Sequence, residues 1–214
     1  NDTGVTAAKW DDSSGKNNHV QQSVVDNRAA VDTGGGLDFE KDNSHHYDLT
    51  TKIDIADNQG FCIAMVLTRE SNVAGGLWCD SSVEMVQITN SNTIRIKTKN
   101  GSNETTTTDA VFAAGTFDIG QKFLLLIDRK EGVANEFTFF KNGTQLTVDG
   151  DLSSNEAQGE NPGGIEFTVL GSNGTAENTN FFDGIIHEAV IFSKGLSVTE
   201  KADVNSYLTG IHGL

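Results

Sequence analysis

Hydrophobic and polar residues alternate along most of the chain, with the period of two that is typical of strands. Residues 94–99 alternate isoleucine and threonine with Arg95, Lys97 and Lys99, which predicts a half-buried strand with a basic outer face. Residues 123–127 are apolar without interruption and predict a central strand buried on both faces. The same reasoning predicts strands at residues 37–40, 47–50, 61–68, 76–79, 85–88, 104–112, 122–130, 136–140, 144–148, 166–170 and 182–193.

Polar turns separate these strands, and one helix follows them. Asn142-Gly143 is the strongest hairpin signal, and residues 90–92 and 100–101 mark two further turns. A short helix is expected at residues 197–209, because Ser197 and Glu200 form a capping-box pair. Its predicted apolar stripe consists of Ala202, Val204, Tyr207 and Leu208, and Gly210 is expected to end the helix. The pattern predicts an all-β fold, an antiparallel two-sheet β-sandwich with one short C-terminal helix. No linker or repeat divides the chain, so residues 1–214 are expected to form a single domain.

The charge of the chain narrows the choice of partners. Its 214 residues include 30 acidic and 15 basic side chains, which gives a net charge of −15. Such a surface repels phosphate backbones and anionic lipids, so we expect no nucleic-acid partner and no membrane insertion. The longest apolar runs, such as residues 61–67, are too short to cross a bilayer as a helix. Asn1 is not an initiator methionine, which suggests a piece of a larger multidomain or multimeric protein.

Two cysteines leave two alternatives open. A hairpin formed by residues 61–68 and 76–80 would place Cys62 opposite Cys79, where a disulfide could form. The other alternative is a pair of half-buried free thiols. The sequence does not choose between them.

Four separated segments share a family pattern. Residues 10–19 read WDDSSGKNNH, residues 36–39 read GLDF before Tyr47-Asp48-Leu49, residues 61–66 read FCIAMV, and residues 182–193 read FDGIIHEAVIFS. In order and spacing they resemble the concanavalin A-like lectin and glucanase superfamily, and within it the laminin-G-like jelly-roll domains. The resemblance extends over essentially the whole chain and implies the same sandwich. His187 departs from the pattern, in which aspartate is usual at this position.

The resemblance also bears on catalysis. Glucanases of this superfamily carry Glu-x-Asp-x-Glu on one strand, where alternation turns both glutamates to the same face as nucleophile and acid. That motif does not occur in this sequence. Adjacent strand residues point to opposite faces, so His45 and His46 do not readily chelate one metal ion. We therefore predict no catalytic residues and a protein that is not an enzyme.

Glu188 is the starting point for a metal-site prediction. If Ile186, Val190 and Phe192 face the core, alternation turns Glu188 inward beside them. A buried carboxylate needs hydrogen-bond donors or a cation. The family resemblance implies a structural Ca²⁺ near the chain ends, with Asp12, Asp183 and Glu188 as candidate ligands. The alternative is a hydrogen-bonded Glu188 that anchors the loop of residues 10–19.

A sugar site is predicted around Trp78. Gly75-Gly76 before it and Asp80 after it place this tryptophan beside a loop, where an exposed indole would offer a flat apolar face to a pyranose ring. Trp10, by contrast, is expected to pack at the end of the sandwich. Neighbouring loops supply groups for sugar hydroxyls. The predicted ligand-binding residues are Trp78, Asp80, His45, His46, Tyr47, Asn173, Asn178 and Asn180.

Three function classes remain on sequence grounds. The preferred hypothesis is a non-catalytic carbohydrate-binding, lectin-like module that binds a polysaccharide or glycoconjugate. Its expected location is extracellular, on a cell surface or on a virion. The second hypothesis is a structural or adhesion domain of a larger assembly, such as a phage fibre or bacterial surface protein. The third is a glycan-cleaving enzyme with an unrecognised site. Fold alone does not choose among them.

Overall fold

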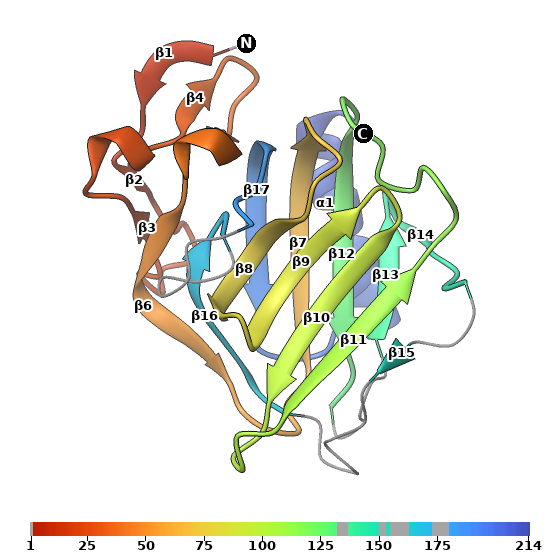
Figure 1. The fold of residues 1–214 in the computed structure, drawn as a ribbon. Coiled ribbons are helices and arrows are strands. Elements are labelled where there is room, and N and C mark those ends of the chain that lie inside the picture. The colour runs from red at the N-terminus through yellow and green to blue at the C-terminus, as the bar shows by residue number, and fades with distance from the viewer. Residues whose placement is uncertain (1, 132–136, 150–152, 155–162, 173–179) are drawn as a thin grey trace.

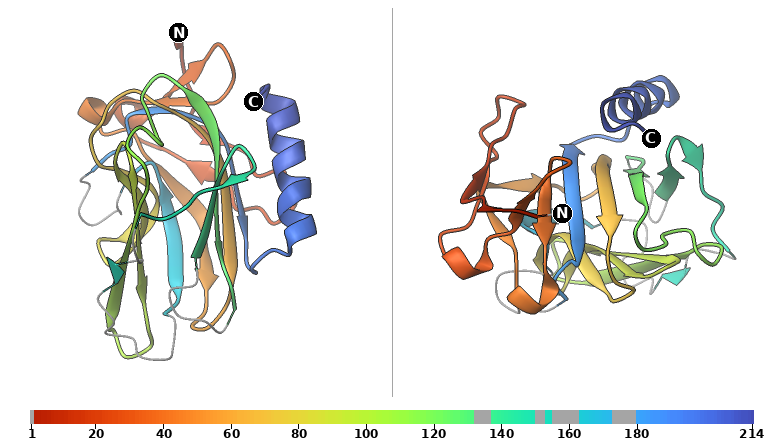
Figure 2. Two further views of the ribbon diagram at one scale, coloured as in Figure 1. Left: turned by 90° about the vertical axis from the view of Figure 1, so that its right-hand side faces the viewer. Right: turned by 90° about the horizontal axis from the view of Figure 1, so that it is seen from above.

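The computed structural model describes residues 2–131, 137–149, 153–154, 163–172 and 180–214. Two antiparallel sheets pack face to face, and one helix lies outside them (Figure 1). Figure 2 shows this helix, α1, against the outer face of one sheet. The predicted all-β sandwich with a C-terminal helix is confirmed.

The sheet next to the helix, here called sheet A, has β7 at its centre. β7 (Phe61–Arg69) pairs with β12 (Lys122–Arg129) on one side and with β17 (Gly184–Phe192) on the other. Both β7 and β12 are almost wholly buried, which confirms the prediction made for residues 123–127 of β12. Its eight strands run in the order β1 (Asp2–Thr6), β4 (Ala30–Asp32), β5 (Leu37–Phe39), β17, β7, β12, β13 (Phe137–Lys141) and β14 (Thr144–Gln145).

The opposite sheet, sheet B, has nine strands. Their order is β15 (Ser153–Ser154), β11 (Thr105–Val111), β10 (Thr93–Lys99), β9 (Glu84–Asn90), β8 (Gly75–Ser81), β16 (Ile165–Leu170), β6 (Tyr47–Ile55), β3 (Val20–Gln21) and β2 (Lys9–Trp10). Ile94 and Ile96 are buried and Arg95 and Lys97 are partly exposed, so the predicted alternation on β10 is confirmed. Two 3-10 turns, Val25–Asn27 and Lys41–Asn43, complete the N-terminal part.

The strongest hairpin signal also forms as predicted. Asn142 and Gly143 have φ angles of 48° and 76° between β13 and β14, as the favoured two-residue hairpin turn requires. The strand after the turn is shorter than the predicted residues 144–148 and ends at Gln145.

Helix α1 (Val198–His212) begins with the predicted capping box. The Glu200 backbone N–H donates to the Ser197 hydroxyl over 3.3 Å, and the Ser197 N–H donates to the Glu200 carboxylate over 2.8 Å. The helix continues past Gly210 and ends at Gly213, which has the left-handed φ of 66°. Leu208 and Val204 pack on sheet A, but Ala202 and Tyr207 are exposed. For those two residues the predicted apolar stripe was wrong.

The core lies between the sheets and is rich in phenylalanine, for example in the edge-to-face pair Phe112–Phe139 at 5.2 Å. Trp10 is half-buried and packs against this core.

The two cysteines lie in different sheets, because β7 belongs to sheet A and β8 to sheet B. The predicted hairpin that would place Cys62 opposite Cys79 was therefore wrong. Both cysteines are free and buried, and burial raises the pKa of each thiol.

Candidate functional site

A cleft of about 300 Å³ is lined by residues of both sheets. Sheet B contributes β2, β3, β8 and β16 to its walls, and sheet A contributes β17. We call it the tryptophan cleft, because both tryptophans of the chain line it. Its lining residues are Trp10, Asp11, Asp12, Ser13, Asn18, Val20, Trp78, Leu170, His187, Glu188 and Ala189.

The loop that forms the outer wall is organised by Asp12. One carboxylate oxygen accepts the Ser14 backbone N–H over 2.8 Å. The other accepts the Ser14 hydroxyl and the Asn18 N–H, each over 2.9 Å. These donors, the Ser14 hydroxyl first, lower the pKa of Asp12 to about 2. Asp12 is thus a structural residue of the wall, and its charge is present at neutral pH.

Asp11 stands on the exposed rim of the same loop. Its side chain is 73% exposed, and one carboxylate oxygen lies 2.6 Å from Lys9 Nζ and 3.1 Å from His19 Nδ1. The hydrogen bond from Lys9 is the main cause that lowers the pKa of Asp11. Lys9 is not among the lining residues, but its ammonium group offsets much of the Asp11 charge at the rim.

Trp78 is buried, and the prediction of an exposed indole was wrong. The residue is 5% exposed, belongs to the core between the sheets and packs edge-to-face on Phe167 at 6.3 Å. A register shift between Gly76 and Trp78 in the β8–β9 pairing marks a β-bulge, which alters the side-chain alternation. Trp78 Nε1 is buried and has no hydrogen-bond partner among the described residues. Trp78 therefore contributes to the inner wall of the tryptophan cleft rather than to the surface.

Glu188 does not face the core, because a bulge in β17 interrupts the alternation on which the prediction rested. Ile186 pairs with Leu67 and Glu188 with Val66, so His187 is the extra residue. Ile186, Ala189 and Ile191 then face the core, whereas Val190 and Phe192 pack on the helix side. Glu188 Oε2 lies 2.8 Å from Nε2 of His212, near the end of α1. Glu188 thus connects sheet A to the helix.

His187, the bulged residue, is held by two hydrogen bonds. Nδ1 lies 2.7 Å from the Gly35 carbonyl, which only accepts, so Nδ1 carries the hydrogen. Nε2 then accepts from the Thr68 hydroxyl over 3.0 Å. Desolvation by burial lowers the pKa of His187, so its ring is neutral at pH 7.

The predicted sugar ligands of the segment 45–47 are structural. Tyr47 is fully buried, donates its hydroxyl to the Ala7 carbonyl over 2.7 Å, and has a pKa raised by burial to about 12. His45 Nδ1 accepts the Glu40 N–H over 3.0 Å, and His46 Nδ1 lies 2.8 Å from the Ser44 carbonyl. All three side chains are buried.

The remaining predicted ligands do not converge with Trp78. Asp80 accepts the Thr168 hydroxyl over 2.9 Å. Asn180 is exposed, and its carbonyl accepts the Gly76 N–H over 2.8 Å. Asn173 and Asn178 lie outside the described residues. Of the six predicted residues that the structure describes, only Trp78 lines the cleft. Sequence reasoning missed Trp10 as a lining residue, although the aspartates and amides that follow it were a usable signal.

The three predicted metal ligands do not form one donor set. Asp12 and Glu188 line the cleft, but each already accepts a hydrogen bond from the protein, as described above. Asp183 lies elsewhere and accepts from Lys41 Nζ over 3.1 Å and from the Lys41 N–H over 3.3 Å. Among the described residues these three carboxylates do not converge on one point, and a calcium ion held by them stays a prediction.

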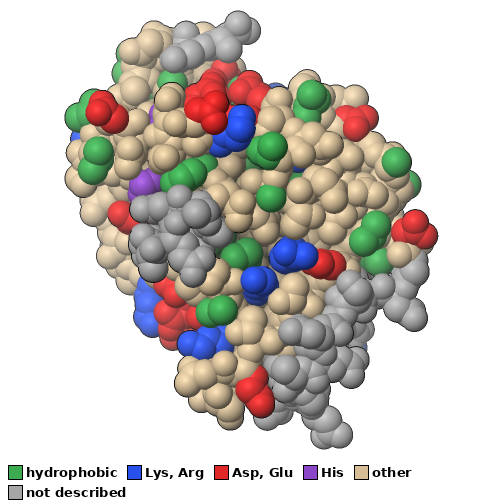
Figure 3. Space-filling model, viewed as in Figure 1, with side chains coloured by type: hydrophobic (Ala, Val, Ile, Leu, Met, Phe, Trp, Pro, Cys, Tyr) green, Lys and Arg blue, Asp and Glu red, His purple; other side chains and the backbone are tan. Residues whose placement is uncertain are grey.

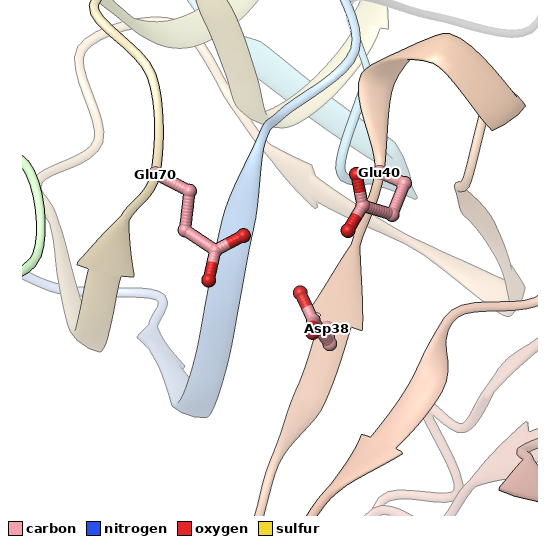
Figure 4. A group of neighbouring side chains, drawn as sticks. All are labelled: Asp38, Glu40 and Glu70. Atoms are coloured by element: carbon pink, nitrogen blue, oxygen red, sulfur yellow. The ribbon is translucent and has the colours of Figure 1, made fainter. Parts of the chain in front are cut away.

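A different group of carboxylates does converge. Asp38 on β5, Glu40 just after it and Glu70 just after β7 point toward one another, with oxygens within 4.8 Å (Figure 4). We call them the acidic trio. Gly184 pairs with both Phe39 and Arg69, which explains how β17 brings Glu40 and Glu70 together. Burial, and then the neighbouring carboxylates, raise the pKa of Glu40 and Glu70.

The basic outer face predicted for β10 is present on sheet B, and Arg95 and Lys97 are engaged in hydrogen bonds. Arg95 makes a bidentate pair with Asp109, with both N···O distances 2.8 Å. Lys97 donates to the Ser82 carbonyl over 2.8 Å. Figure 3, which views this face, shows basic and acidic side chains side by side. The face therefore offers little free positive charge to an anion.

Comparisons with known proteins leave the family open. No protein-family model and no curated protein sequence matches the chain. Among solved structures, the chain is similar to the botulinum neurotoxin serotype G binding domain (14% identity, TM-score 0.48), covering 77% of this chain and 40% of that one. It is also similar to the CBM40 of Ruminococcus gnavus IT-sialidase bound to α2,3-sialyllactose (17% identity, TM-score 0.45), covering 70% and 83% respectively. The chain thus spans less than half the length of the toxin domain. At these values the likeness assigns neither a family nor a ligand to this chain.

Proposed function

We propose that this protein is a non-catalytic carbohydrate-binding module whose ligand enters the tryptophan cleft. The observation that carries the proposal is the lining itself, in which two indoles lie beside the carboxylates, hydroxyl and amide of one well-ordered loop. Sugar recognition needs this combination, because a pyranose has apolar C–H faces and a rim of hydroxyl groups. Trp10, which is half-buried, is the residue that we assign to the sugar face.

The carboxylates of the cleft support binding rather than hydrolysis. Glycoside hydrolysis needs two carboxyl groups on opposite sides of the scissile bond. Asp11 and Asp12 are neighbours on one loop, and Asp12 has both oxygens occupied by loop donors. Glu188 is directed to His212 on the helix side. The described lining residues therefore offer no acid and nucleophile pair.

The parent protein and its location belong to the same proposal. The sequence pattern shared with laminin-G-like domains favours a surface, secreted or virion protein. A shallow site replaces many sugar–water hydrogen bonds, so each copy should bind weakly. Several copies on one assembly would then supply useful avidity.

No described helix combines the length and apolar composition that crossing a bilayer requires.

One observation favours an assembly or adhesion role as a second candidate. Helix α1 exposes Tyr207 (62%) and Ile211 (56%), which are four residues apart on one face of the helix, and Leu214 (37%) is exposed just after its end. An apolar stripe of this kind is typical of a contact surface. Sedimentation equilibrium of the wild-type protein and of Ile211→Lys distinguishes the candidates, because a stable oligomer that the variant dissociates would favour assembly.

Glycan binding is tested first by an array screen and then by calorimetry on the best ligand. Trp10→Ala should weaken binding at least tenfold, because it removes the exposed part of the aromatic wall. Tyr207→Ala is the matched control, since it removes an exposed aromatic ring on α1, outside the cleft lining. Incubation with the ligand should create no new reducing ends. Equal affinity of folded Trp10→Ala and wild type would show that the site is wrong.

A further inference from the structure

The last turn of α1 contacts the wall of the tryptophan cleft from outside. His212 is not among the lining residues, yet it touches two residues that are. Its Nε2 lies 2.8 Å from Glu188 Oε2, and its ring centroid lies 6.1 Å from that of His187. A carboxylate only accepts hydrogen bonds, so Nε2 of His212 is the donor. One residue of the helix therefore holds two consecutive residues of the cleft wall.

These two wall residues lie at a bulge on an open strand edge. His187 is the extra residue in the β17–β7 pairing. On the other side of β17, β5 pairs only as far as Ile186. Beyond Ile186, the described part of the chain adds no further strand to that edge. Because a bulge disrupts the ladder and re-aims side chains, the position of this wall depends on side-chain contacts.

The same contact also matters to the helix. An isolated helix of 15 residues is marginal in water, and Leu208 is the one buried side chain of α1. Thr209 bonds only within the helix, so among the described residues His212 makes the one side-chain hydrogen bond from the last turn to sheet A. The His212 and Glu188 side chains are 14% and 30% exposed, so solvent screens their contact less than one on the open surface. Docking of this turn and the position of the cleft wall therefore share one contact.

We infer that His212 is a positioning residue for the tryptophan cleft, so that the docked last turn of α1 and a ligand in the cleft stabilise each other through Glu188 and His187. The inference rests on the proposed function and adds a means of regulating that site. Such coupling is reciprocal: if the docked turn favours binding, a bound ligand favours the docked turn by the same factor.

The first experiment needs no sugar, because both tryptophans of the chain line the cleft and their fluorescence reports on its wall. Acrylamide quenching is compared for wild type, His212→Ala and His212→Gln. His212→Ala should raise the quenching constant about twofold, since a looser wall admits the quencher more often. His212→Gln should restore most of the wild-type value, because its amide N–H can donate to Glu188. Ile211→Ala is the matched control, since it removes an exposed side chain from the same turn.

The second experiment measures the coupling. Galactose, glucose, mannose, N-acetylglucosamine and N-acetylneuraminic acid are titrated into the wild type, and the tightest binder is kept. His212→Ala should weaken its binding about fivefold, as one lost hydrogen bond would, and His212→Gln by about twofold at most. In the wild type, the same sugar at saturation should slow amide hydrogen exchange at residues 209–212 about fivefold.

A merely structural role of His212 would lower the Tm of His212→Ala and leave quenching, affinity and exchange unchanged. Any of these three null results in a folded protein would overturn the inference and leave the proposed function standing. An equal loss of affinity in His212→Gln and His212→Ala would contradict the assigned hydrogen bond. If His212→Ala does not fold, hydrogen exchange in the wild type decides the question. If none of the sugars binds, quenching decides the inference and the array screen decides the proposed function.

Discussion

Two polar regions lie along the same strand, β17, and they have opposite imbalances of hydrogen-bonding groups. Beside the tryptophan cleft, Trp78 has a buried indole N–H without an acceptor among the described residues. In the acidic trio, reached through Gly184, three carboxylates crowd together and acceptors are in excess. An unpaired donor lacks an acceptor, whereas crowded carboxylates favour protons or cations. The comparison shows that the acidity of the chain as a whole does not set the chemistry of each region.

Gly184→Ala should have the largest effect, because this residue joins the two regions. Gly184 has a φ of 140°, and an added Cβ would lie 2.1 Å from the Thr68 carbonyl oxygen. We expect a loss of about 3 kcal/mol in the free energy of unfolding from strain and overlap. Urea denaturation measures it, and both the acidic trio and the β17 wall should be disturbed.

Gly210→Ala is the matched control for that substitution. Gly210 lies inside α1, and an added Cβ would meet nothing within 4 Å. Alanine should stabilise the helix by roughly 0.5–1 kcal/mol. Equal destabilisation by both substitutions would contradict the special role assigned to Gly184.

Asp12→Ala should have an intermediate effect that is confined to the cleft. The loop loses three hydrogen bonds, but the site is solvent-screened, so we expect a loss of about 1 kcal/mol. The pKa of Asp12 is about 2 in the folded protein against an ordinary value of 3.8. Its contribution is therefore complete above pH 4 and is lost as pH falls toward 2.

Thermal melts of wild type and Asp12→Ala between pH 2 and pH 7 measure this dependence. The difference in Tm between the two proteins should shrink at low pH. Asp203→Ala, an exposed substitution on α1, should leave a small and pH-independent difference. A constant difference for Asp12→Ala would contradict the assigned role of its carboxylate.

Glu70→Gln should have the smallest effect and the opposite sign. The pKa of Glu70 is raised in the folded protein, so its carboxyl group favours folding below its ordinary value of 4.5 and opposes it as pH rises through the raised value. Removing the charge should stabilise the protein at pH 7 by roughly 0.5 kcal/mol, since solvent screens this exposed group. Melting curves at pH 4 and pH 7 should show the gain at pH 7 only, whereas Glu131→Gln should show none.

The same two proteins test whether a calcium ion binds at the acidic trio, which is a different place from the predicted ligands Asp12, Asp183 and Glu188. Wild type and Glu70→Gln are melted in millimolar Ca²⁺ and in chelator. A rise in Tm that Glu70→Gln removes would locate an ion at the acidic trio, because binding to the folded state alone stabilises it. Unchanged Tm in both proteins would argue against a structural calcium ion in this part of the molecule.

Much of the fold could be predicted because its signals are local. The alternation at residues 94–99, the apolar run at 123–127 and the turn at Asn142-Gly143 each act within a few residues. The capping box of Ser197 and Glu200 is equally local.

The candidate site could be predicted only in part, and each error has a non-local cause. Glu188 was assigned to the wrong face because the bulge at His187 is a property of the β17–β7 pairing. Trp78 was expected at the surface although sheet A covers it.

The sequence by itself determined the sandwich, the capped helix and the acidic surface, because strand alternation, turn geometry and net charge depend on residue order and composition. Only the tertiary structure decided which polar groups meet. The Trp10 loop and Trp78 line one cleft because β2 and β8 belong to sheet B, and β17 of sheet A supplies the facing wall. Glu40 and Glu70 meet because two strands pair with the same glycine of β17. Sheet register and bulges are set by contacts between distant segments, and no local pattern specifies them.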